Sequence, residues 1–284
     1  MMKERFKKIL KVINSNSQLR LGLILLCILV GVAVFAPIIS PRNPYYLYDD
    51  IMQAPGSKYW LGTDKLGRDV FSMVIYGTRV SLLIGVVAAS ISAVLGTTIG
   101  AISGYFGGKI DSVVSEFINI FVMTPTFFLI LIVIALFGSD IYKVMVVIGL
   151  TSWTGNARLM RAQAISIKER TFIKSARVIG ESKFKIMLKH VIPNGIFPVI
   201  ANTTMNISSA ILTEAGLSFL GLGDPNVVSW GQIIAHGKTY LTQGWWISVF
   251  PGLMVIFTVL TFFLIGDGLN KVLSPKLNGQ EGGE

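Results

Sequence analysis

The chain has 284 residues, of which 52% are apolar and only 14% are charged, and its net charge is +10 at pH 7. A typical soluble domain has about 25% charged residues, so this composition excludes a disordered chain, a coiled coil and an ordinary soluble enzyme. It predicts an all-α, polytopic membrane protein. The single cysteine, Cys27, excludes an internal disulfide and gives no indication of an oxidising compartment.

The N-terminal segment 1–20 is basic and amphipathic. Its apolar residues follow the helical spacing i, i+3, i+4, i+7, with lysines largely on the other side: Phe6, Ile9, Leu10 and Ile13. This pattern predicts a helix that lies on an anionic membrane surface. A cleaved signal peptide is the alternative, but residues 34–36 (Val-Phe-Ala) make a poor small-x-small cleavage site.

Six segments have the roughly 20 mostly apolar residues that a membrane-spanning helix needs, or come close to it. They are 21–39, 81–106, 117–137, 141–153, 195–220 and 247–265. The fourth is short and carries Lys143 at its edge, and Pro125 is expected to kink the third. Small residues in the second are expected to allow close helix packing: Gly85, Ala89, Gly96, Gly100 and Gly104. Tryptophans near span ends are interpreted as interfacial anchors: Trp153, Trp230, Trp245 and Trp246.

The basic residues predict how these spans are oriented. Of the 25 Lys and Arg residues, 18 fall in four segments that are therefore predicted to be cytoplasmic: 1–20, 107–116, 154–194 and 266–284. The remaining seven lie in the extracytoplasmic stretches, chiefly in the loops 40–80 and 221–246. The positive-inside rule thus favours a cytoplasmic position for both termini.

The predicted cytoplasmic loop 154–194 has nine basic residues and a helical pattern. We expect one helix over 157–179 and a second over 182–191, because Gly180 separates them. Each helix has an apolar stripe: Phe172, Ile173, Ala176 and Ile179 in the first, and Phe184, Met187, Leu188 and Val191 in the second. Such a helix pair predicts a docking element for a partner with a cleft; a solvated loop that only sets the topology is the alternative.

Residues 171–180 (TFIKSARVIG) and 190–194 (HVIPN) resemble the coupling-loop motif of ATP-binding-cassette (ABC) importer permeases. That motif is written EAA, three residues, G, nine residues, I-x-L-P, and its spacing matches throughout. Lys174 and Ser175 replace the Glu and the first Ala, and His190 replaces the Ile, an ending typical of the peptide/nickel branch. The resemblance implies that this set contacts an ATPase: Phe172, Lys174, Ser175, Ala176, Arg177, Gly180, His190, Pro193 and Asn194.

Further segments resemble the second, C-type permease subunit of that branch, chiefly residues 61–72, 214–223 and 229–231. The resemblance implies a type I importer fold with a permease core over about 80–275, in a bacterial-type cell membrane. It also implies three kinds of partner: a homologous permease, two cytoplasmic ATPase subunits that bind ATP and magnesium, and an extracytoplasmic solute-binding protein. The expected solute is a dipeptide or oligopeptide; nickel, a metal chelate and an oligosaccharide are the alternatives.

The sequence itself contains no catalytic machinery. The nearest approach to a phosphate-binding P-loop, Gly107-Gly108-Lys109, lacks the first glycine of that motif. His190, His236 and Cys27 fall in different compartments or depths, so no metal site is expected. We therefore expect a non-enzymatic subunit without a cofactor, and no contact with nucleic acid.

Polar residues in the fifth span predict a solute path. They recur at i, i+4, i+7 and i+11, which places them on one helix face: Asn202, Asn206, Ser209 and Thr213. Glu214 adds a carboxylate, and an ionisable group inside a membrane is costly and often functional. Interhelical hydrogen bonding within the subunit is the alternative.

Asp64 and Arg68 are four residues apart and are expected to pair across a helical turn, either facing the binding protein or as a local ion pair. Two other classes of membrane protein remain as alternatives. An ion-driven secondary transporter usually has paired intramembrane charges or internal repeats, and only Glu214 qualifies here. A membrane scaffold would need neither the polar stripe nor the docking loop.

Overall fold

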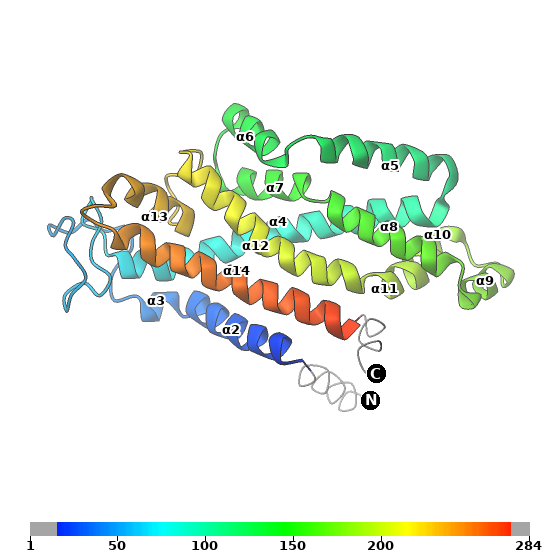
Figure 1. Ribbon diagram of the computed structural model, residues 1–284, viewed down its shortest axis with the longest axis horizontal. Coiled ribbons are helices and arrows are strands. Elements are labelled where there is room, and N and C mark those ends of the chain that lie inside the picture. The colour runs from blue at the N-terminus through cyan, green and yellow to red at the C-terminus, as the bar shows by residue number, and fades with distance from the viewer. Residues whose placement is uncertain (1–15, 274–284) are drawn as a thin grey trace, which may run out of the picture.

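The computed structural model describes residues 16–273, so the amphipathic helix predicted over residues 3–13 lies outside the described part of the chain. The described residues form an elongated helical bundle (Figure 1). Three helices are long and apolar enough to cross a membrane: α2 (Ser17–Val34), α4 (Val70–Phe106) and α14 (Trp246–Leu273). The start of α2 and the end of α14 lie side by side, because Lys271 Nζ donates to Gln18 Oε1 at 2.6 Å.

The central helix is α4, which packs against α7, α8 and α12. It has 37 residues, so it is about 55 Å long, well beyond the roughly 30 Å of a bilayer's hydrocarbon core. The helix starts at Val70, ahead of the predicted span, because the Asp69 side chain caps it by accepting from Ser72 N at 2.9 Å.

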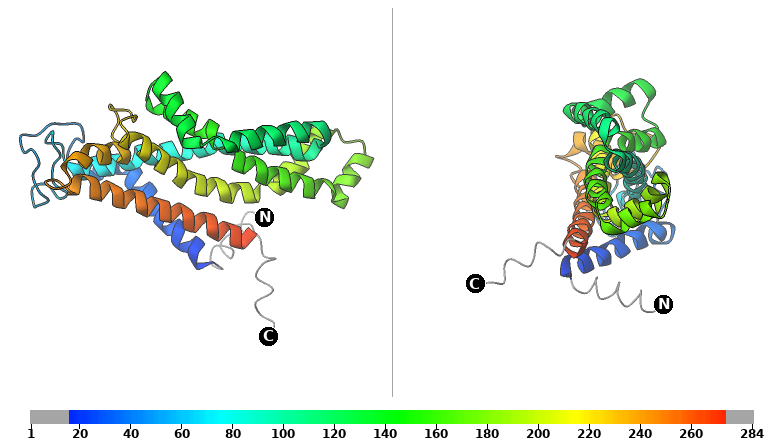
Figure 2. Two further views of the ribbon diagram at one scale, coloured as in Figure 1. Left: turned by 45° about the horizontal axis from the view of Figure 1, so that its top comes forward. Right: turned by 90° about the vertical axis from the view of Figure 1, so that its right-hand side faces the viewer.

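Two pairs of helices are bent at short breaks. An 80° bend separates α5 (Gly108–Met123) from α6 (Thr126–Phe137), as Figure 2 shows. The predicted kink at Pro125 is thus confirmed, because proline disfavours helical backbone at the residue before it, and Thr124 is extended. A 62° bend separates residues 183–195 from α12 (Phe197–Phe219).

The fourth predicted span contains the short helix α7 (Ile141–Thr151). Its 11 residues extend only about 16 Å, which is too short to cross a bilayer alone. By length and composition, the described residues contain three spanning helices, or up to five if each bent pair is one span. The count of six crossings therefore stays a prediction.

The prediction of one helix over residues 157–179 is wrong. This stretch contains two helices, α8 (Thr154–Lys168) and α9 (Thr171–Val178), which are separated by extended backbone at Arg170. Ile167 and Ile173 are both fully buried in one apolar cluster, yet in a continuous helix they would point about 120° apart. The break lets both face the core. Beyond it the chain continues through α10 (Lys183–Ile186), the π-helical turn η1 (Met187–Val191) and α11 (Ile192–Gly195).

The opposite end of the bundle is formed by the loop 40–69, α3 (Ala36–Ile39), α13 (Trp230–Gly237) and the short helix η2 (Lys238–Tyr240), as Figure 1 shows. Trp230 Nε1 donates to Val74 O at 3.0 Å, and Trp246 Nε1 donates to Thr63 O at 3.1 Å. The interpretation as interfacial anchors is therefore wrong for Trp153, Trp230 and Trp246, which are buried inside the protein. Of the four tryptophans so interpreted, Trp245 is the exposed one.

Candidate functional site

The segment from α8 to α11 forms one end of the bundle and divides its apolar residues between core and surface. Ile173, Ala176, Met187 and Val191 are buried, which anchors the segment. Other apolar side chains project from it and form what we call the apolar tip: Phe172 (42% exposed), Val178 (88%), Ile179 (84%) and Phe184 (60%). In each predicted stripe, two of the four side chains are therefore buried in the core and two are exposed.

Gly180 ends α9 in a left-handed conformation, with φ of +85°. The Glu181 N–H donates to Ala176 O and the Gly180 N–H donates to Arg177 O, both at 3.1 Å, which is the Schellman pattern of a helix C-terminus. A Cβ atom at Gly180 would meet nothing within 4 Å. The glycine is therefore required by its backbone conformation and not by crowding.

A charged cluster joins the end of α9 to η1. His190 Nε2 donates to Glu181 Oε2 at 2.9 Å, and Lys185 Nζ lies 3.3 Å from Glu181 Oε1. The hydrogen bond from His190, followed by that from Lys185, lowers the pKa of Glu181. The Asn194 amide donates to His190 O at 2.7 Å, at the point where Pro193 starts the turn into α11.

The remaining predicted contact residues lie on the outer surface of α9. Lys174 Nζ is 3.5 Å from Glu169 Oε2, the Ser175 hydroxyl donates to Thr171 O at 3.1 Å, and Arg177 is exposed. The structure therefore brings the predicted residues of this segment together around one short helix and its cap.

The helix α8 packs backbone to backbone on α4. A Cβ atom on Gly100 would come within 2.3 Å of Ala157 O, and one on Gly104 within 2.4 Å of Arg161 O. The expectation of close packing is thus confirmed. Arg161 also binds Asp111 of α5 through two bonds of 2.6 and 2.7 Å, so α4, α5 and α8 form one firmly joined unit.

The polar stripe of α12 only partly faces open space. Asn202 donates to Asn156 Oδ1 at 2.9 Å, Asn156 donates to Ser92 Oγ at 3.2 Å, and Ser92 donates to Ser152 O at 2.8 Å. This buried chain links α12, α8 and α4. The sequence does not predict the contact between Asn156 and Ser92, because Asn156 falls in the predicted cytoplasmic loop 154–194 and Ser92 falls in the predicted span 81–106. Asn206 and Thr213 are half-buried and Ser209 is exposed.

Glu214 lies about 100° around α12 from Thr213, off the polar stripe. Its side chain is only 2% exposed, and Oε1 accepts from Ser218 Oγ and Ser229 Oγ, both at 2.7 Å. Ser229 caps α13, so the carboxylate joins α12 to α13. Its other oxygen, Oε2, has no hydrogen-bond partner among the described residues and lies beside Gly231.

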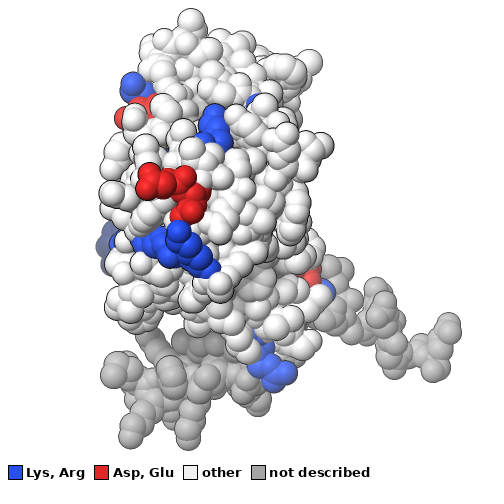
Figure 3. All heavy atoms as spheres, turned by 90° about the vertical axis from the view of Figure 1, so that its left-hand side faces the viewer, with Lys and Arg blue, Asp and Glu red and all other residues white. Residues whose placement is uncertain are grey.

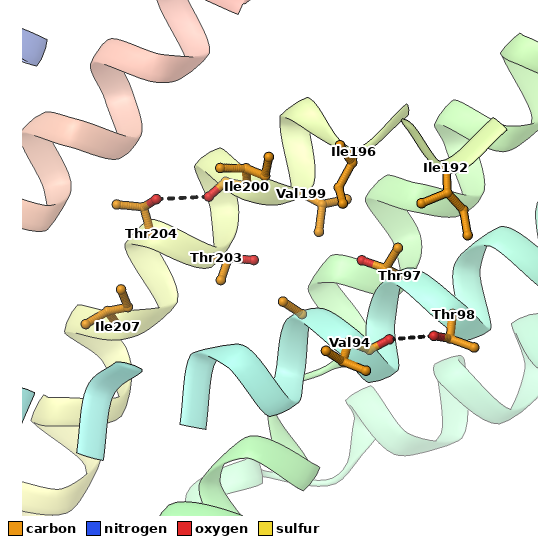
Figure 4. A pocket seen from close by; sticks show the side chains of 11 residues that line it. Val94, Thr97, Thr98, Ile192, Ile196, Val199, Ile200, Thr203, Thr204 and Ile207 are labelled. Atoms are coloured by element: carbon orange, nitrogen blue, oxygen red, sulfur yellow. Dashed lines mark hydrogen bonds between the residues drawn. The ribbon is translucent and has the colours of Figure 1, made fainter. Parts of the chain in front are cut away.

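A groove of about 440 Å³ runs between α4 and α12 (Figure 4). Val94, Thr97 and Thr98 line one wall, and Thr203, Thr204 and Ile207 line the other. Thr98 and Thr204 turn their hydroxyls to backbone carbonyls of their own helices, which leaves the groove largely apolar. None of the predicted path residues lines it.

At the opposite end, which Figure 3 shows, acidic and basic side chains lie side by side. Asp64 and Arg68 form the expected ion pair at 2.6 Å, but in a turn closed by Gly67 and not in a helix. The pair is nearly buried, and Arg68 Nη2 donates to His236 Nδ1 of α13 at 3.1 Å. Burial, then the charges of Arg68 and Lys65, lower the pKa of His236 below 6.5.

Within residues 16–273, no three His, Cys, Asp or Glu side chains come close enough together to hold a metal ion. The described residues instead form an end with exposed apolar side chains, a bundle joined by buried polar contacts and a groove beside it.

Comparison with known proteins agrees with this arrangement. Residues 96–279 match the family model described as "Binding-protein-dependent transport system inner membrane component". The chain is 33% identical to a dipeptide transport system permease protein DppC of Alkalihalophilus pseudofirmus, over 97% of this chain and 90% of the relative. It is 37% identical to a glutathione transport system permease protein GsiD of Escherichia coli, over 89% of this chain and 84% of the relative.

A chain in an inward-facing structure of the MetNI methionine ABC transporter has the same fold, with a TM-score of 0.56 and 19% identity. The match covers 70% of this chain and 96% of that chain. The protein is therefore a multi-pass membrane protein that belongs to the family of inner-membrane components of binding-protein-dependent transport systems, and it is an ABC importer permease.

Proposed function

We propose that this chain forms half of the translocation path of an importer for short peptides, paired with a homologous permease. One observation carries the proposal: its similarity to permeases named for dipeptide and glutathione transport spans nearly the whole chain. The alternative solutes for the same architecture are nickel, a metal chelate and an oligosaccharide.

The apolar tip is the proposed contact of this chain with a cytoplasmic ATPase. The importer has two such ATPase subunits, which bind ATP and magnesium. The chain itself has no catalytic role and no cofactor. Apolar side chains exposed at an aqueous end are costly unless a partner covers them. The Schellman end at Gly180 and the Glu181–His190 contact hold the tip in one conformation, which a lever requires. Motion would pass from α9 through α8 to α4, because α4 and α8 are in backbone contact.

This assignment places α9 and both termini in the cytoplasm, and the loop 40–69 with α13 on the outer face. That face is the proposed contact for a solute-binding protein. Asp64 and Arg68 support it indirectly, since their nearly buried ion pair holds the loop in shape against α13. The stripe from Asn202 to Thr213 is the proposed polar lining, with Ser209 the most open of its members.

A reconstituted system of both permeases, the ATPases and the binding protein tests the proposal. We expect ATP-dependent uptake of a labelled dipeptide into vesicles. Phe172→Asp and Ile179→Asp are expected to release the ATPases on purification, whereas Lys189→Gln, a change in an exposed residue of the same segment outside the predicted contact set, is not. Uptake driven by an ion gradient without the ATPases would contradict the importer assignment. ATP-dependent uptake of nickel alone would contradict only the peptide substrate.

A further inference from the structure

A hollow of about 330 Å³ lies where the end of α4 meets the segment from α8 to α10. These helices meet at the same end of the bundle as α9 (Figure 1). We call it the basic cavity. Its lining consists of Tyr105, Phe106, Lys168, Glu169, Arg177 and Lys183. The transport function proposed above uses none of these side chains except Arg177.

The basic cavity has an excess of positive charge. Three of its six residues are cations, and its one carboxylate, Glu169, pairs with Lys174 outside the cavity at 3.5 Å. Lys168 Nζ donates to Gly104 O at 3.0 Å, which holds it against the end of α4. Within residues 16–273, neither Arg177 nor Lys183 has a carboxylate partner. The cavity is therefore suited to an anion that approaches from outside the chain.

Tyr105 adds an aromatic ring to the lining of the cavity, and its side chain is only 5% exposed. The guanidinium of Arg177 lies 5.7 Å from the centre of the same ring, which places a cation beside it.

The position of the cavity points to the source of the anion. Phe106, the last residue of α4 and of the predicted span, is 40% exposed and lies beside the cations. The cations therefore match the phosphate of a lipid headgroup, and the exposed ring of Phe106 beside them matches the acyl chains of the same lipid. Free inorganic phosphate would gain nothing from Phe106.

We propose that the basic cavity binds the phosphate of an anionic phospholipid headgroup. Arg177, Lys168 and Lys183 supply the positive charge, and Phe106 contacts the acyl chains. The lipid then bridges the end of α4 to α9 and α10. Only the choice of the cytoplasmic leaflet rests on the orientation proposed above.

The test uses the purified, delipidated full-length chain in detergent, titrated with phosphatidylglycerol, phosphatidylcholine or inorganic phosphate. Bound lipid is counted by native mass spectrometry, and the unfolding temperature confirms that each variant is folded. We expect tight binding of phosphatidylglycerol, weakened about fivefold for each charge removed by Arg177→Gln and Lys183→Gln.

The matched control is the double variant Arg170→Gln and Lys189→Gln, which removes the same charge from exposed positions of the same segment outside the cavity. It is expected to bind phosphatidylglycerol as the parent does. Equal weakening in this control and in the double variant of Arg177→Gln and Lys183→Gln would overturn the proposal in favour of diffuse surface attraction. Inorganic phosphate that competes at the same concentration would overturn the lipid source. Loss of the lipid on adding the ATPases would assign the cavity to a protein partner instead. None of these outcomes bears on peptide uptake.

Discussion

The Glu214 carboxylate shows how one side chain can join two helices. Its Oε1 accepts from Ser218 of α12 and from Ser229 at the start of α13. Removing the acceptor in Glu214→Ala leaves the buried hydroxyls of Ser218 and Ser229 without an acceptor, although Ser229 still accepts from the Gln232 N–H. We expect this to cost about 1–3 kcal/mol each and to loosen α13. Glu214→Gln keeps an acceptor at that place and is the control.

The measurement for Glu214 is protease sensitivity of the loop 221–246 together with the unfolding temperature. Glu214→Ala is expected to lower the temperature and expose the loop, and Glu214→Gln to change both much less. If Glu214→Gln abolishes uptake while both readouts stay at the parental values, the carboxylate acts in transport and not in holding α13.

The buried ring of His236 predicts a pH dependence of stability at the end of the bundle formed by the loop 40–69 and α13. Its pKa is lowered in the folded chain by burial and by Arg68 and Lys65, with Asp64 opposing them. The unfolded chain therefore binds a proton at a higher pH than the folded chain does. The free energy of unfolding should be constant above about pH 6.5 and fall as the pH drops through the window below it. A protonated ring would also lose the hydrogen bond from Arg68.

Comparing the parent with His236→Gln isolates this contribution, because the other titrating groups are common to both chains. The unfolding temperature of each is measured at pH 7.5 and pH 5.5. The parent is expected to lose more stability over this range. Equal losses would show that His236 does not titrate between these values.

At the scale of the element, the contact of α4 with α8 depends on the lack of a side chain at Gly100. A Cβ atom there would lie 2.3 Å from a backbone oxygen, which cannot rotate away. Gly100→Leu should therefore push the helices apart and destabilise the protein by about 1–3 kcal/mol. Gly31→Ala in α2, where a Cβ atom meets nothing within 4 Å, is the control and should be neutral or slightly stabilising. Thermal unfolding of both variants measures this, and equal behaviour would contradict it.

Gly180 predicts a different outcome, because its surroundings are open but its backbone is left-handed. Gly180→Ala should cost about 1–2 kcal/mol at the end of α9, whereas Gly180→Asn should cost less, since Asn tolerates this conformation better. The expected effects are weaker copurification of the ATPases and a fall in the unfolding temperature of about 2–4 °C per kcal/mol lost. Equal copurification by the alanine variant would show that the cap does not position the apolar tip.

The positions of Gly180 and Pro193 in the segment from α8 to α11 could be predicted from the sequence, because the effect of each residue is local. Gly180 and Pro193 each determine the backbone of their own turn, and a motif records such positions. The break at Arg170 could not be predicted, because the stretch from 157 to 179 is acceptable as one helix by local preference. Burial of both Ile167 and Ile173 against other parts of the bundle decides it.

At the scale of the whole molecule, the all-helical fold follows from composition, but the partners of the polar residues do not. Asn202 meets Asn156, which is 46 residues away, and Arg68 meets His236, which is 168 residues away. Periodicity places Asn202 on a helix face but says nothing about which helix comes next to that face. Contact with the ATPases, the solute and the binding protein stays a prediction for the same reason, since it depends on surfaces of other chains.

The length of α4 has a consequence for the transporter as a whole. Its first turn is capped beside the Asp64–Arg68 pair, and its last turn is bound to Lys168 next to the docking segment. No break interrupts the 37 residues between them. In the orientation proposed above, a binding protein outside and nucleotide binding inside would act on opposite ends of this one uninterrupted helix.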